Sequence, residues 1–139
     1  MRLRKHHGTR VHLQLKPTRG LGYESSQKYL HSNAGLGIGA VLSAARMGRV
    51  SHRKEDVPRY LYIPADDHRD FELHQFFNQT FEFIEMARKS TNVLVHCMVG
   101  VSRSVTIVAA YLIKKYKYSL RDVFNTIQRK RTKVKYHPS

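Results

Sequence analysis

Two residues in the segment VHCMVGVSRS, residues 95–104, suit anion chemistry by type and spacing: Cys97 and Arg103. An apolar, strand-like run precedes this segment and a helical pattern follows it. A loop between a strand and a helix turns its backbone N–H groups toward one centre, and the helix N-terminus adds a positive field. About five or six amides fit around an oxyanion such as phosphate, and the planar Arg103 guanidinium can hold two of its oxygens. The residues predicted to bind the anion with Arg103 are Met98, Val99, Gly100, Val101 and Ser102.

Cys97 is the only cysteine of the chain. The groups that stabilise a bound anion also stabilise a thiolate, so the sulfur is predicted to be a nucleophile rather than a small buried hydrophobe. A single cysteine cannot form an internal disulfide, and we find no signal peptide pattern and no apolar run near 18 residues. We therefore expect a reduced thiol, no membrane span, and a cytoplasmic or nuclear location.

The neighbours of Cys97 and Arg103 have supporting roles in this interpretation. His96 is expected to face away from the substrate, where its ring would bond the loop backbone and fix the sulfur; a proton shuttle is the minor alternative. Ser104 can point its hydroxyl at the sulfur and stabilise the departing thiolate. It can equally cap the helix N-terminus, and the sequence leaves both roles open.

Cleavage of a phosphate ester also needs a proton for the departing oxygen. The acidic segment PADDHRD, residues 64–70, is the only stretch upstream that offers such a group. Its three carboxylates are Asp66, Asp67 and Asp70. Their distance along the chain from Pro64 does not show which of them is the general acid.

Several elements must position these residues. Strands are predicted at AVLS (40–43, entered from a glycine turn), RYLYIP (59–64) and NVLVHC (92–97), and VHLQL (11–15) reads as an edge strand. One amphipathic helix begins at Leu73 and ends near residues 89–92. Its apolar face is formed by Leu73, Phe76, Phe77, Phe81, Ile84 and Ala87.

Two further helices are predicted after the Cys97 segment. Residues 104–116 are apolar almost all round and form a central buried helix. Ser119 is the N-cap of the last helix in the capping box SLRD. The buried stripe of that helix is predicted to consist of Leu120, Val123, Phe124 and Ile127. The alternation of strands and helices indicates a single α/β domain.

The chain carries 25 Lys and Arg against 10 Asp and Glu, a formal charge of +15. This charge attracts phosphate-bearing partners, and clusters at 2–7, 114–117 and 129–135 could contact an acidic or polyanionic partner or serve in nuclear targeting. A solvated basic surface is the simpler interpretation of each cluster. Nucleic acid is the less favoured partner.

The segment HCMVGVSRS resembles the HCxxGxxRS signature of cysteine-based protein tyrosine phosphatases, and specifically their small, atypical dual-specificity branch. The similarity runs from about Ile38 to Arg131, with AVLS similar to the VLN strand of the family. The resemblance implies one domain with a twisted, mostly parallel sheet of about four to five strands flanked by helices. It places this catalytic domain at 26–139, apparently without the usual C-terminal helix, after a basic leader at 1–25 that could hold an edge strand.

The resemblance also implies a mechanism. Cys97 would attack phosphorus, Arg103 and the loop amides would hold the oxygens, and Asp67 falls on the family's general acid, with Asp66 as the alternative. Asp67 would then activate water against a cysteinyl-phosphate, with no metal and no cofactor required.

The expected substrates are phosphoproteins bearing phosphotyrosine, phosphoserine or phosphothreonine. The loop side chains Met98, Val99 and Val101 are apolar, whereas relatives that act on inositol lipids are basic there. Two alternatives remain: a phosphoprotein-binding, pseudophosphatase-like module, and a phosphatase directed at RNA 5′-phosphates or other polyanions.

Overall fold

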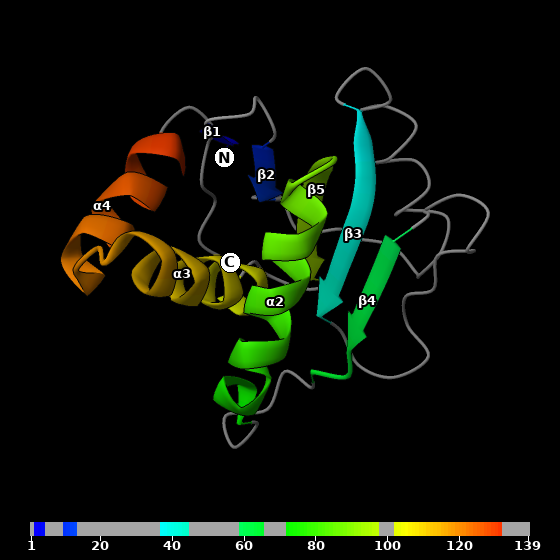
Figure 1. Cartoon of the computed structure of the whole chain (residues 1–139). Helices are drawn as coiled ribbons and strands as arrows, with labels where there is room; N and C mark the ends of the chain where they lie inside the picture. Colours follow the sequence, from blue (N-terminus) through cyan, green and yellow to red (C-terminus); the bar gives the residue numbers. More distant parts are fainter. Residues whose placement is uncertain are drawn as a thin grey trace.

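The computed structural model describes residues 2–4, 10–13, 37–44, 59–65, 72–97 and 102–131. A five-stranded sheet in the order β1-β2-β5-β3-β4 forms the centre of the molecule (Figure 1). The strands are β1 (Arg2–Arg4), β2 (Arg10–Leu13), β3 (Ile38–Ala44), β4 (Arg59–Ile63) and β5 (Asn92–Cys97). The pair β1 and β2 is antiparallel, and all other pairs are parallel. This confirms the α/β class and the mostly parallel sheet.

The N-terminal part of the sheet differs from the expectation. The strand expected within residues 11–15 is β2, but it lies inside the sheet between β1 and β5 rather than at its edge. Its outer side pairs with β1, where Leu3 is opposite Val11. Val11 and Leu13 are buried, which agrees with an interior strand. The rest of residues 1–25, the expected leader, lies outside the described residues.

A bulge near the start of β3 sets the register of the central strands. Ile38 pairs with Asn92 and Ala40 pairs with Val93, so Gly39 is an extra residue on β3. A Cβ at this position would collide with the side chain of Thr91, so glycine is required. After the bulge the two strands remain in step to their ends.

The described helices form a layer on one side of the sheet. They are the 3-10 turn η2 (Leu73–Phe76), α2 (Phe77–Arg88), α3 (Ser102–Tyr116) and α4 (Leu120–Arg131). The predicted helix from Leu73 is confirmed, with a 3-10 first turn. Figure 1 shows α3 between α2 and α4. The buried residues of α3 join those of the strands in one core. None of the described helices has the length and apolarity needed to span a bilayer.

The predicted start of the last helix is confirmed, but two of the four residues of its predicted buried stripe are exposed. Ser119 Oγ accepts the backbone N–H of Asp122 at 3.1 Å, which confirms the N-cap. Val123 and Ile127 are buried, whereas Leu120 is 59% exposed and Phe124 is 53% exposed. The main described neighbour of α4 is α3, and Leu120 and Phe124 lie outside the buried contact.

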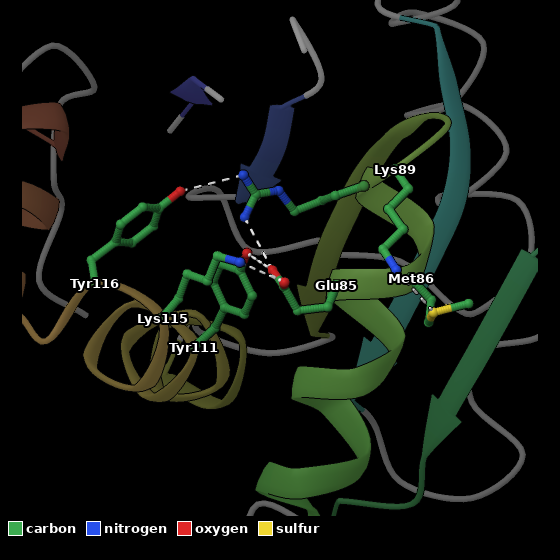
Figure 2. A network of polar contacts seen from close by, with 7 residues as sticks. Glu85, Met86, Lys89, Tyr111, Lys115 and Tyr116 are labelled. Carbon is green, nitrogen blue, oxygen red and sulfur yellow. Dashed lines mark hydrogen bonds and ion pairs between the residues drawn. The ribbon is translucent and has the colours of Figure 1, made fainter. Parts of the chain in front are cut away.

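A network of polar side chains joins α2 to α3 (Figure 2). The Glu85 carboxylate accepts the Tyr111 hydroxyl at 2.5 Å and the Lys115 ammonium at 2.6 Å. Arg88, which is 1% exposed, lies 3.5 Å from Glu85, donates to the Tyr116 hydroxyl at 3.3 Å and covers the Tyr111 ring. Because the Glu85 carboxylate on α2 bonds two side chains of α3, the network holds α3 against α2.

The exposure pattern of α4 predicts unequal costs for two similar truncations. Ile127→Ala should lower the free energy of unfolding by about 2–5 kcal/mol, because it removes buried methyl groups and leaves a cavity. Leu120→Ala is the matched control and should change it by no more than about 0.5 kcal/mol. Urea unfolding followed by circular dichroism measures both. Equal losses would show that Leu120 is covered in solution.

The polar network makes a second prediction about stability. Glu85→Gln should cost about 3 kcal/mol, since it leaves the buried Arg88 guanidinium without its carboxylate. Lys115→Met removes the other cation, which is 31% exposed, and should cost less than about 1 kcal/mol. The comparison uses the same urea titrations. A larger loss for Lys115→Met than for Glu85→Gln would contradict this assignment.

Candidate active site

Cys97 is the last residue of β5, at the carboxyl end of a strand with parallel neighbours on both sides. Ligands of α/β proteins bind at this end of a parallel sheet. The side chain is 3% exposed and belongs to the core on the helix side. The chain is described again from Ser102, where α3 begins. The predicted anion-binding residues Met98, Val99, Gly100 and Val101 lie outside the described residues.

Ser104 brings its hydroxyl to the sulfur. Its Oγ lies 3.2 Å from Cys97 Sγ, and the residue is fully buried. Because α3 begins at Ser102, Ser104 belongs to the first helical turn and does not occupy the N-cap position. Of the two roles left open by the sequence, the geometry favours contact with the sulfur.

Arg103 connects the start of α3 to the end of β4. Its Nη1 donates to the Ala65 carbonyl oxygen at 2.5 Å, and the residue is 7% exposed. Its positive charge also acts on Tyr62: burial raises the pKa of this phenol, and Arg103 partly offsets that rise. Among the described residues, the buried Nε of Arg103 has no acceptor. Since buried N–H groups are usually paired, this side of the guanidinium suits a bound anion or the adjoining loop.

The candidate acids Asp66, Asp67 and Asp70 lie outside the described residues, but the chain leading to them does not. Ala65 is fully buried, and its N–H donates to the Ile63 carbonyl at 2.7 Å in a tight turn. The carbonyl of the same residue accepts from Arg103. The chain therefore enters the acidic segment directly beside the guanidinium, with Asp66 and Asp67 one and two residues further on.

His96 lies on the opposite face of the sheet from Cys97, as alternation along a strand requires. Its Nε2 lies 2.5 Å from Ser43 Oγ, and both residues are buried. The expected contact with the loop backbone involves residues outside the described part. The partner Ser43 was missed by the sequence analysis. The available signal was a polar residue at the end of a buried strand.

The described residues contain no group of three or more His, Cys, Asp or Glu side chains that could hold a metal ion. The local chemistry consists of a thiol, a hydroxyl and a guanidinium at the junction of β5, α3 and β4. Together these groups can provide a nucleophile, a hydrogen bond to it and a positive charge at the same junction.

Sequence comparison places these residues in a known family. The model for the catalytic domain of dual specificity phosphatases matches residues 21–138. Dual specificity protein phosphatase 9 of Homo sapiens is 37% identical over 123 residues, which cover 88% of this chain and 32% of that protein. Dual specificity protein phosphatase 7 of Homo sapiens is 45% identical over 76 residues, 54% of this chain and 18% of that protein. The chain thus matches a third or less of the length of these relatives.

Solved structures agree with this placement. DUSP15 superposes with a TM-score of 0.65 and 27% identity, over 92% of this chain and 81% of that chain. The human tyrosine phosphatase-like serine/threonine/tyrosine-interacting protein superposes with a TM-score of 0.66 and 26% identity, over 83% of this chain and 76% of that chain. The signature residues lie at the end of β5 and at the start of α3. The chain belongs to the dual specificity phosphatase catalytic domain family.

Proposed function

We propose that the chain is a cysteine-dependent protein phosphatase that hydrolyses phosphotyrosine and phosphoserine or phosphothreonine. The observation that carries this proposal is the cluster of Cys97, Arg103 and Ser104, in which the sulfur and the Ser104 hydroxyl are 3.2 Å apart. Family membership supports a phosphoprotein as the substrate. A nucleophilic thiol must stay reduced, so we place the enzyme in the cytoplasm or the nucleus.

In the first step the Cys97 thiolate attacks phosphorus while the ester P–O bond breaks. Asp67 gives its proton to the departing oxygen, and a cysteinyl-phosphate remains. Arg103 and the amides of the loop, residues 98–102, hold the non-bridging oxygens. The support for this role of Arg103 is that its guanidinium is buried, fixed through Nη1 on Ala65, and has Nε turned to no other acceptor within the described residues.

In the second step Asp67 takes a proton from water, and the resulting hydroxide attacks phosphorus. The P–S bond breaks and phosphate leaves. The Ser104 hydroxyl then donates a hydrogen bond to the thiolate that forms on Cys97, which lowers the barrier for its departure. Since Arg103 and the amides supply the charge stabilisation, the mechanism needs no metal ion.

The substrate class follows from the loop and the charge of the chain. Met98, Val99 and Val101 are apolar, so they favour a phosphorylated protein side chain over a highly charged inositol phosphate. The net charge of +15 favours acidic surroundings of the phosphorylated residue, and the basic clusters could contact other polyanions.

A binding module is the second candidate function, because one structural relative is named a phosphatase-like, interacting protein. Such a module would bind phosphoproteins without hydrolysing them. Cys97, Arg103 and the acidic segment are all present in this chain, which favours catalysis. Turnover of an aryl phosphate separates the two functions, since a binding module would show none.

Replacement of the nucleophile tests the proposal directly. The wild type should hydrolyse p-nitrophenyl phosphate in the presence of EDTA, and Cys97→Ser should abolish that activity without unfolding the protein. Arg103→Lys keeps the charge but loses the planar fork, and should lower kcat about 10²–10³-fold. Metal-independent turnover by folded Cys97→Ser protein would rule out Cys97 as the nucleophile.

Leaving-group dependence tests the acid. Asp67→Asn should lower kcat about 10²-fold for a phenyl phosphate with a poor leaving group, and much less for p-nitrophenyl phosphate, because only the poor leaving group needs a proton. Asp66→Asn is the matched control and should resemble the wild type. If the two variants exchange behaviour, Asp66 is the acid.

A further inference from the structure

We propose that the corner between the end of α3 and the start of α4 is a docking surface for an acidic segment of another protein that also carries apolar side chains. This surface, the α4 corner, consists of Lys117, Tyr118, Leu120, Arg121 and Phe124. It lies at the opposite end of α3 from Ser102, about 20 Å along the helix from the candidate active site (Figure 1). The inference goes beyond the proposed function and does not depend on it.

Two apolar side chains of α4 are exposed on the same side of the helix. Leu120 is 59% exposed and Phe124 is 53% exposed. They are four residues apart, so they are neighbours on the helix surface. The other apolar residues of the helix, Val123 and Ile127, are buried. Single exposed apolar residues are common, whereas adjacent ones with cations beside them are typical of an interaction site.

The Tyr118 ring lies two residues before Leu120 and is held in place by its neighbours. It is 42% exposed and stacks on the Tyr116 ring, with the ring centroids 5.5 Å apart. Tyr116 is itself restrained, because Arg88 donates to its hydroxyl at 3.3 Å. An aromatic side chain that is already fixed loses little conformational entropy when a partner binds. Tyr118 is therefore a suitable contact for apolar side chains of a partner.

The charges at the corner indicate the chemistry of the partner. Residues 114–131 contain seven Lys and Arg and one acidic residue, Asp122. Lys115 is paired with Glu85 of α2, whereas Lys117 and Arg121 are exposed at the corner itself. A segment with carboxylates beside its apolar side chains matches both properties of this surface.

Lys117 has a backbone conformation that favours glycine. Its φ is 59°, and its N–H donates to the Ile113 carbonyl at 3.0 Å, so the residue ends α3 in the left-handed conformation. Among the described residues other than glycine, it is the only one with a positive φ. A lysine in this conformation costs free energy that a glycine would not. Its presence is explained if the charge of the side chain binds a partner.

Other occupants match the corner less well. A second copy of the chain carries the same net charge of +15, and residues 132–139, which follow α4, contain no acidic residue. RNA bases stack on aromatic rings, whereas the most exposed apolar side chain of the corner is Leu120. A helix that binds an anionic membrane inserts a whole apolar face, and α4 already buries part of its own in the core.

Peptide binding tests the proposal without using catalysis. The probes are short fluorescein-labelled peptides rich in Glu and Leu, with the Leu residues at helical, alternating or clustered spacing. Fluorescence anisotropy at physiological ionic strength measures their affinity for the full chain. At least one peptide should bind, and changing its Leu to Ser or its Glu to Gln should weaken binding at least about 10-fold. The proposal is wrong if none of the peptides binds.

Matched variants locate the bound peptide. Phe124→Ser should weaken binding about 10-fold, because it removes an aromatic contact from the centre of the surface. Met86→Ser is the control: Met86 is 56% exposed but lies on α2, so binding should not change. Circular dichroism checks that both variants are folded. Equal affinity of the wild type and Phe124→Ser would overturn the proposal, as would equal losses in the two variants.

Lys117→Gly gives a result that a purely structural lysine would not. The change removes the left-handed lysine, so Tm should rise by about 2–4 °C, while the lost charge should weaken peptide binding about 3-fold. A higher Tm with unchanged affinity would contradict the proposal.

Two further probes test the other classes of partner. Poly(U) RNA and phosphatidylserine vesicles should bind wild type and Phe124→Ser with the same affinity, since neither is expected to contact the apolar side chains of the corner. If either one binds more tightly than every peptide and Phe124→Ser abolishes that binding, the corner serves that ligand and the proposal is wrong.

Discussion

The hydrogen bond from Arg103 to the Ala65 carbonyl joins three parts of the site: the start of α3, the end of β4 and the entry to the acidic segment. It constrains the arrangement because a guanidinium with one edge fixed can offer only its other edge to a ligand. The bond depends on α3 being held at the correct position over the sheet. The core residues of α3 and the Glu85 network with α2 supply that restraint, at some distance from Cys97.

Two arginines are buried within the described part of the chain, and their surroundings differ. Arg88 lies beside the Glu85 carboxylate and over the Tyr111 ring, so the protein itself balances its charge. Among the described residues, no carboxylate pairs with Arg103; a neutral carbonyl holds it instead. Burial of a charge is costly unless an opposite charge balances it, and the proposed function assigns that part to the phosphate that Arg103 would bind.

The sequence predicted the elements that depend on local pattern. Periodicity located α2 and α3, and the serine before α4 is its N-cap because capping involves residues three apart. The sequence could not predict contacts between segments that are distant along the chain. The pattern of α4 could not reveal which of its apolar residues meet the rest of the fold, so Leu120 and Phe124 were wrongly assigned to the buried stripe. The role of Ser104 stayed open because it depends on the residue at which α3 begins. The interior place of β2 was missed because residues 2–4, read as part of a basic cluster, were not predicted to form β1, the strand that pairs with β2.

The bulge at Gly39 shows how backbone length can matter as much as side chains. Side chains alternate between the faces of a sheet, so a strand that loses or gains one residue exchanges its two faces. The bulge lies before residues 40–44, so it takes up the extra residue without disturbing the row in which Ser43 pairs with His96. Point changes along β3 therefore affect one contact at a time, whereas an insertion or deletion there would alter the whole row at once. Among homologous sequences, the distance from this glycine to the end of β3 should vary less than the residues between them.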